Sequence, residues 1–482
     1  MSPSTVILVI LAYFGILMLF SAFTSRNSSS NSDFFVASRR SKWYIVAFGM
    51  IGSSVSGISL VAVPAMVQDS GFTYLQMCLG FVVGYVVVAV VLLPIFYHNN
   101  LTSIYGYLQN RFGRYTHKTG AWFFIISKII TSSSKLYVAV LVLQKFIFSA
   151  WDIPVGLSTT ICVAMIWLYT FRGGIKTIVF TDALQSLVLF VTIVLMLVGI
   201  VGLLGFSASE AVLSVWDSPL SRTFVLTDFV SDKNFFKQFF SGVFVVIVMT
   251  GLSQDMMQTT LSCRNLREAQ KNMIAYGSCF VPFNLLLLTL GALMSIYSTN
   301  NGITLPDNLN SIVPMFAADY FTPIVAVMFM IGIIAATFNS ADSAMTSIAT
   351  IFFVDILQYN DNTSKSVKIR QIIYFATCVV FVAVIMMFDS IKNQNLLDTI
   401  YTIVGYAYGP LLGLFAFGLF TKWQIRDHLL PIVAILSPIF TYLISIGFRY
   451  WFNYKFGYEL LLINGLLMFM MLIAIKKQKH AY

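Results

Sequence analysis

The chain has 482 residues, of which 58% are hydrophobic and 10% are charged, and its mean hydropathy is +0.84. Soluble domains contain only roughly 45–50% apolar residues, so this composition excludes an ordinary soluble enzyme or binding module and predicts one integral membrane domain over 1–482. The net charge of +10 is scattered over short loops, which excludes the basic patch of a nucleic-acid-binding protein.

Apolar segments long enough to cross a bilayer recur along the whole chain. A transmembrane helix needs about 20 mainly apolar residues, and by this criterion we expect about thirteen spans. In chain order they are 4–22, 43–66, 73–96, 119–148, 152–170, 178–205, 235–257, 271–297, 322–353, 368–390, 396–421, 429–447 and 455–476. The sequence therefore predicts an all-α membrane protein.

Lysine and arginine alternate between rich and poor loops: one set of loops holds about 20 of them and the other about 7. Basic loops stay in the cytoplasm, so we expect a cytoplasmic C-terminus and an external N-terminus in an inner or plasma membrane. The rich loops are at 26–42, 111–118, 172–176, 264–271, 365–370 and 422–426, with the tail at 476–479, and the other side has Lys145, Arg222, Lys233, Lys237, Lys392, Arg449 and Lys455.

The sequence lacks the motifs of an ATPase and of a hydrolytic enzyme. No Gly-Lys pair occurs, so the phosphate-binding loop is missing and no nucleotide partner is expected. The histidines His98, His117, His428 and His480 fall in loops or at span ends. The stretch "TIVGYAYGP" (402–410) is faintly similar to a potassium-channel filter, which keeps an ion channel as an alternative.

The span 322–353 carries a polar arc. At about 100° per residue, small and polar side chains share one face, with Asp342 at its edge. A charged side chain at a helix centre costs about 2.5–3.5 kcal/mol, so Asp342 is expected to face a cation, a cavity or a partner such as Lys128 or Lys135. Close helix packing is the other interpretation of the small residues. The arc consists of Ala336, Asn339, Ser340, Ser343 and Ser347.

Two further segments are polar within apolar surroundings. "FGMIGSSVSGISLVAVPAM" (48–66) is rich in glycine and serine, which predicts a helix broken midway that exposes carbonyls for sodium, unless these residues only pack closely. "GGIKTIVFTDALQ" (173–185) brings Asp182 and Gln185 to the start of the sixth span, where a helix cap is the alternative reading.

Five segments in this order carry a resemblance to a known family. They resemble the sodium:solute symporter family, which includes sodium/glucose, proline, iodide and bacterial sialic acid transporters. The resemblance implies a leucine-transporter-type inverted repeat (5+5) over 43–421, with a leading helix at 4–22 and two trailing helices at 429–476. The segments are "SDFFVASRRSKWYIVAFGMIGSSVSG" (32–57), "GGIKTIVFTDALQ" (173–185), "GLSQDMMQTTLSCRNLREAQKN" (251–272), "NSADSAMTSIATIFFVDI" (339–356) and "YGPLLGLFAFGLFTKW" (408–423).

The resemblance implies two sodium sites. At the second, a position that is often Ser in the family is Asp342, and two carboxylates in one site favour a bound sodium or one protonated acid. At the first, the family pattern Ala-x-x-Ser-Ser has become Ala-x-x-Asn-Ser, and an amide oxygen still suits sodium. The first site takes the carbonyls of Gly52 and Val55 with Ala336, Asn339 and Ser340, and the second takes Asp182 with Asn339, Asp342 and Ser343.

The resemblance also places the solute near the membrane midplane. Val246 and Met249 stand where a sugar-binding Asn and a gating Tyr are found in the sodium/galactose relative, which weakens a hexose assignment. Lys135 can meet a solute carboxylate, pair with Asp342 or snorkel. The expected solute residues are Ser56, Ser59, Tyr74, Gln76, Thr131 and Lys135.

The predicted function is that of a symporter that couples sodium influx to uptake of a small polar solute, which can bear a carboxylate, by alternating access. A proton-coupled transporter of the same fold is the first alternative, and an ion channel is the second.

Overall fold

The computed structural model describes residues 3–25, 30–146, 148–171, 173–228, 231–359, 363–391, 396–454, 456–457 and 459–477. These residues form helices and connecting loops, and they include no β-strand. Arg26, Arg172, Lys392, Lys455, Lys479 and His480, which entered the sequence predictions, lie outside the described residues.

The first half of the chain forms the helices α1 (Pro3–Ser25), α2 (Asn31–Val36), α3 (Trp43–Ser54), α4 (Gly57–Ser70), α5 (Tyr74–Val87), α6 (Leu93–His98), α7 (Gly106–Arg111), α8 (Arg114–Phe146), α9 (Val155–Thr170), α10 (Ile175–Leu204) and α11 (Ala208–Trp216). The second half forms α12 (Phe235–Val246), α13 (Gln254–Leu261), α14 (Leu266–Asn300), α15 (Ile312–Asp319), α16 (Pro323–Ile351), α17 (Ser364–Ile391), α18 (Leu396–Phe420), α19 (Leu430–Phe452) and α20 (Leu460–Ala474).

The helices match the predicted spans. Among the described residues, eight helices are long and apolar enough to cross a membrane, and two bent helix pairs pass the same test. Three shorter apolar helices, Val155–Thr170, Gly405–Phe420 and Leu460–Ala474, coincide with the remaining predicted spans. The predicted ends differ by several residues, because helices such as α8 and α14 continue past the apolar stretch into polar turns.

Four short helices, α2, α7, α11 and α15, lie in loops for which we predicted no helix, because none is long enough to span a membrane. The sequence at the start of α11 does contain a helix-capping pattern. Ser207 accepts the backbone N–H of Glu210, and the Glu210 carboxylate accepts the backbone N–H of Ser207, which is a capping box.

Two spans are broken at the same place in each half of the predicted repeat. The pair α3 and α4 bends by 63°, as the glycine and serine run predicts. The pair formed by Phe235–Gly251 and α13 bends by 65°, so the span predicted over 235–257 is present, with a break that the sequence did not predict. The Tyr105 hydroxyl donates to the freed Leu252 carbonyl at 2.9 Å, so the break is satisfied by a distant segment.

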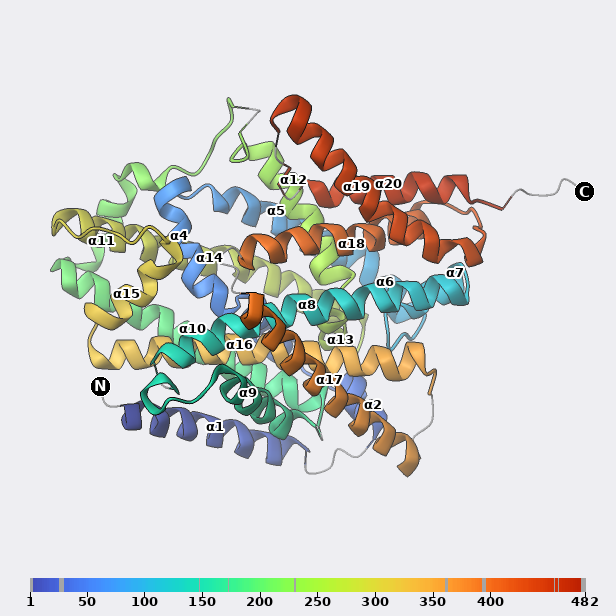
Figure 1. Cartoon of the computed structure of the whole chain (residues 1–482), viewed down its shortest axis with the longest axis horizontal. Coiled ribbons are helices and arrows are strands. Elements are labelled where there is room, and N and C mark those ends of the chain that lie inside the picture. The colour runs from blue at the N-terminus through green and yellow to red at the C-terminus, as the bar shows by residue number, and fades with distance from the viewer. Residues whose placement is uncertain are drawn as a thin grey trace, which may run out of the picture.

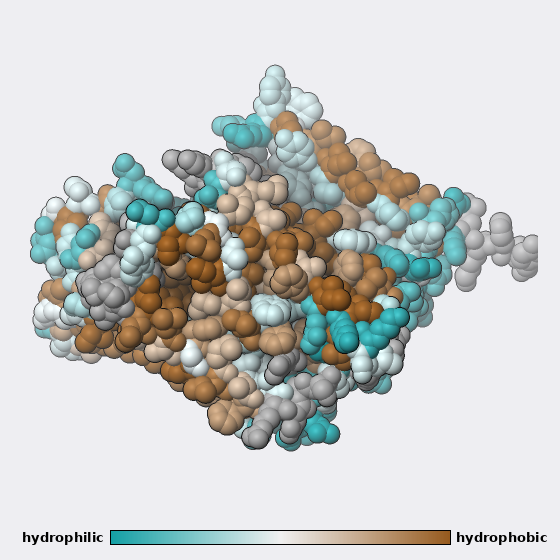
Figure 2. All heavy atoms as spheres, turned by 60° about the horizontal axis from the view of Figure 1, so that its bottom comes forward, coloured by the Kyte–Doolittle hydropathy of each residue, from teal (hydrophilic) through white to brown (hydrophobic). Residues whose placement is uncertain are grey.

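Figure 1 shows α8 and α16 running through the middle of the molecule, with α1 on one side and α19 and α20 on the other. The spanning window of α16 is 83% buried, against 28% for that of α19. Hydrophobic residues cover the middle of the face in Figure 2, and hydrophilic residues gather toward its ends. This distribution fits a belt of lipid around a buried central helix.

The filter-like stretch 402–410 lies inside α18 and is helical throughout. A selectivity filter needs a re-entrant loop that lines a pore. The described backbone therefore gives no support to the ion-channel alternative.

Candidate functional site

The first break joins three elements through Ser53. The Ser53 hydroxyl contacts Asn339 Oδ1 of α16 and donates to Asp182 Oδ2 of α10 at 3.2 Å. The Ser53 carbonyl accepts the hydroxyl of Ser340 at 2.9 Å. The end of α3 is thereby fastened to α10 and α16, the two helices on which the sequence placed the acids.

Gly52 is required by this close approach. Its N–H donates to Ser186 Oγ at 3.0 Å. A Cβ at this position would lie 2.3 Å from Ser186 Oγ and 2.8 Å from Asn339 Nδ2. Only glycine lets the broken helix pack this closely against its neighbours.

All five residues predicted for the first sodium site are buried around the break: Gly52, Val55, Ala336, Asn339 and Ser340. Val55 follows the last residue of α3 and has a non-helical backbone (φ −83°, ψ 84°). Asn339 Oδ1 contacts Ser53, and Asn339 Nδ2 donates to the Asp182 carbonyl at 3.3 Å. Asn339 therefore also links the two predicted sites.

The second predicted site contains buried carboxylate oxygens without partners. The Tyr169 hydroxyl of α9 donates to Asp342 Oδ2 at 2.7 Å. Asp182 Oδ1, Asp342 Oδ1 and Ser343 Oγ have no hydrogen-bond partner in the part of the chain that the structure describes. Buried polar atoms are nearly always paired, so oxygens of this kind fit the hard ligand set of a sodium ion.

No lysine or arginine among the described residues forms an ion pair with these acids. Of the ion pairs between described residues, neither involves Asp182 or Asp342. The prediction that Lys128 could pair with Asp342 is wrong, because Lys128 pairs with Asp255 instead. The two acids therefore have no basic partner in the described part of the chain.

Sequence reasoning missed two tyrosines at this site. Tyr169 holds one oxygen of Asp342. Tyr13 of the leading helix α1 lies beside Asp182, Gln185 and Asp342. Nothing in their local sequence distinguishes them from other tyrosines in apolar spans, so only the packing of α1 and α9 reveals them.

The predicted solute residues fall into two groups. Ser56 and Ser59 lie just past the first break, with their hydroxyl oxygens 3.5 Å apart. Their helix, α4, contacts α8, the helix that bears Lys135. The hydroxyl of Thr131, one turn before Lys135, donates to the Ser127 carbonyl of its own helix at 2.8 Å. This group therefore comes from two helices that contact each other, α4 and α8.

The second group lies at the start of α5. The Gln76 amide donates to the Lys233 carbonyl at 2.9 Å and to Gln238 Oε1 at 3.1 Å, and its oxygen accepts the N–H of Val225 at 3.1 Å. Tyr74 packs edge-on against Phe81. Gln76 therefore holds the segment 225–238 by hydrogen bonds, and both polar atoms of its side chain have partners.

The second break carries an ion pair that the sequence did not reveal. Lys128 of α8 contacts Asp255 Oδ2 in the first turn of α13. The Ser253 hydroxyl donates to Asp255 Oδ1 at 2.5 Å. Both oxygens of this buried carboxylate are therefore satisfied within the protein.

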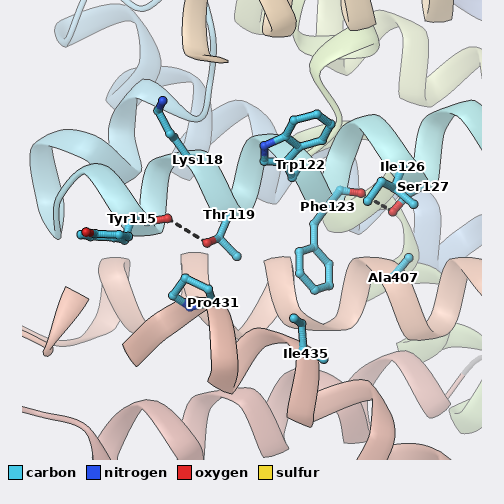
Figure 3. Close-up of a pocket in the computed structure, with 10 residues that line it drawn as sticks. All are labelled: Tyr115, Lys118, Thr119, Trp122, Phe123, Ile126, Ser127, Ala407, Pro431 and Ile435. Atoms are coloured by element: carbon cyan, nitrogen blue, oxygen red, sulfur yellow. Dashed lines mark hydrogen bonds between the residues drawn. The ribbon is translucent and has the colours of Figure 1, made fainter. Parts of the chain in front are cut away.

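A groove of about 480 Å³ lies between α8, α18 and α19, away from both breaks (Figure 3). Trp122 and Ile126, which line it, are 43% and 54% exposed. None of the predicted site residues lines this groove.

Two broken helices in apolar spans, with buried acids that form no ion pair among the described residues, are typical of a secondary transporter with an inverted-repeat fold. The model of the sodium:solute symporter family matches residues 34–425. The chain therefore belongs to this family, whose members are transporters: it is a multi-pass membrane protein and a sodium-coupled solute transporter.

The chain is 25% identical to the sodium/sialic acid symporter NanT of Aliivibrio fischeri, over 95% of this chain and 92% of NanT. It is also 25% identical to the human sodium/iodide cotransporter, over 81% of this chain and 61% of that protein. A solved structure of a Na+-coupled sialic acid symporter in a substrate-bound outward-open state matches 98% of this chain and 99% of that one, with a TM-score of 0.82 at 19% identity.

These findings confirm the predicted family, the leucine-transporter-type fold and sodium as the coupling ion. The division of 1–482 into a leading helix, a core over 43–421 and two trailing helices stays a prediction. The individual sodium and solute residues are also predictions still.

Proposed function

We propose that this protein imports a small solute bearing an anionic group together with sodium, across an inner or plasma membrane, with its N-terminus outside and its C-terminus in the cytoplasm. The observation that carries the proposal is the pair of buried carboxylates, Asp182 and Asp342, with no basic side chain in ion-pairing distance among the described residues. Such a site needs a cation from solution.

At the first site, sodium would sit between the break and α16. The proposed ligands are the carbonyls of Gly52 and Val55 with Ala336, Asn339 and Ser340. Sodium bound there would hold α3 and α4 against α16, which favours one of the alternating-access states. The structure supports this role because Ser53 already bonds both Asn339 and Ser340.

At the second site, sodium would bind Asp182, Asp342 and Ser343. One charge that moves through 100 mV supplies about 2.3 kcal/mol, before any concentration gradient is counted. Two bound sodium ions would supply twice that electrical work.

The solute would lie beside the first break, between Ser56 and Ser59 on α4 and Thr131 and Lys135 on α8. Lys135 is partly buried, and no described acidic side chain lies within ion-pairing distance of it. A buried cation of this kind recruits an anionic group. The names of the relatives, which specify sialic acid, iodide and monocarboxylates, point in the same direction. Tyr74 and Gln76 would act through the adjoining outer loop.

Sodium binding to the purified protein tests the proposal. Thermal unfolding is followed against sodium and potassium at constant ionic strength, where an ion at 100 times its dissociation constant adds about 2.7 kcal/mol of stability. We expect sodium-specific stabilisation that Asp182→Asn and Asp342→Asn reduce or abolish. Asp389→Asn is the matched control, because Asp389 also accepts a tyrosine hydroxyl, from Tyr137 at 3.0 Å, but lies in α17.

The proton-coupled alternative rests on the same two carboxylates. If stability follows pH through these acids and shows no sodium-specific term in the wild type, sodium coupling at this pair is refuted. A sodium response that survives both substitutions would move the ion to the first site alone.

A further inference from the structure

Three charged side chains belong to α8 and the second break: Lys128, Lys135 and Asp255. Lys128 and Lys135 are seven residues apart on α8, so they share one face about 10 Å apart along the axis. Asp255 lies in the first turn of α13, directly after the break. The charges of Lys128 and Asp255 both reach Lys135.

Two of these charges cancel. Asp255 binds Lys128 through one oxygen and accepts the Ser253 hydroxyl through the other. Asp255 also occupies the positive end of the α13 half-helix, a place where transporters of this architecture bind anionic solute groups. Of the two lysines, Lys135 is then the one that has no ion-pair partner among the described residues.

We propose that Asp255 is a specificity-determining residue: by holding Lys128 and the end of α13, it leaves a single unpaired positive charge, so the transporter accepts solutes with one negative charge and rejects dianions. This inference rests on the proposed function, in which Lys135 meets the anionic group of the solute. A second carboxylate on the solute would find no counter-charge at membrane depth, where an unpaired charge is strongly unfavourable.

The test compares monoanions with dianions on purified protein in saturating sodium. Sialic acid, iodide, pyruvate and monomethyl malonate are the monovalent probes, and malonate and succinate are the divalent ones. We expect the wild type to be stabilised by at least one monovalent probe and by neither divalent one. In Asp255→Asn, Lys128 loses its partner, and the affinity for dianions relative to monoanions should rise about tenfold or more.

Two further variants separate charge from structure. Lys128→Gln leaves Asp255 unpaired, so the formal charges at positions 128, 135 and 255 sum to zero. Monoanion binding should therefore fall about tenfold or more. Asp255→Asn combined with Lys128→Gln removes the pair as a unit and should restore the wild-type preference. Sodium-induced stabilisation shows that each variant is folded, and either single variant suffices for the test.

The outcomes distinguish the two proposals. If the wild type shows a sodium response but binds no anion, the proposed solute class is wrong. If the wild type binds a monoanion and either folded single variant keeps the wild-type ratio and affinity, the role of Asp255 is refuted while the proposed function stands.

Discussion

The two broken helices differ in how their charge is balanced. At the first break, Asp182 and Asp342 each keep a buried oxygen without a partner among the described residues. At the second break, Asp255 is fully bonded to Lys128 and Ser253. The two breaks therefore differ: in the proposed function the first receives its cation from solution, whereas the second has a cation of its own, Lys128.

The difference has a physical consequence for stability. A buried acid without a counter-ion weakens the folded state until an ion binds, which makes folding and ion binding depend on each other. A buried pair with complete hydrogen bonding costs little as a unit but much when it is split. Removing one charged side chain should therefore have opposite effects at the two breaks when sodium is absent.

The largest effect is expected from splitting the pair at the second break. Lys128→Met leaves Asp255 buried and unpaired, which should lower the free energy of unfolding by about 3–5 kcal/mol. Denaturant unfolding in detergent measures it. The double variant Lys128→Met with Asp255→Leu should return close to wild-type stability. If the single and double variants are equally unstable, the pair is not a self-contained unit.

A middle-sized effect is expected at the close contact of the first break. Gly52→Ala places a Cβ 2.3 Å from Ser186 Oγ, so we expect a loss of about 1–3 kcal/mol and weaker sodium binding. Gly202→Ala is the matched control, because no atom outside its own helix lies within 4 Å of the new Cβ. That change should leave stability unchanged or raise it by about 0.5–1 kcal/mol.

Thermal unfolding with and without sodium measures both glycine variants. Equal behaviour of Gly52→Ala and Gly202→Ala would show that the first break does not depend on close packing.

The contrast between the breaks also shows what sequence reasoning could reach. The first break follows from its glycines and serines, and the polar arc of α16 follows from helical spacing. The second break contains Gly251 but no proline, and it is held by Tyr105 and by Gln254, whose amide donates to the Thr102 carbonyl at 2.9 Å. Those partners lie about 150 residues away in the chain, so no local pattern announces them.

The pairing of charges was beyond sequence reasoning for the same reason. From the sequence, either Lys128 or Lys135 could pair with Asp342, because spacing along α8 does not show which helix each lysine faces. Only the packed structure shows that Lys128 turns to Asp255 and that Tyr169 holds Asp342. Residue types and periodicity predict that charges are buried, whereas tertiary packing decides which of them meet.

The smallest expected effect is the most specific to the comparison. Asp342→Asn keeps an amide oxygen that can accept the Tyr169 hydroxyl but removes one of two uncompensated negative charges. Without sodium, the variant should therefore be more stable than the wild type by about 1 kcal/mol. As sodium is added, the wild type should gain stability and overtake the variant, so that the two melting curves cross. A variant that is less stable than the wild type at zero sodium would mean that Asp342 is neutralised inside the protein, and the contrast between the two breaks would be lost.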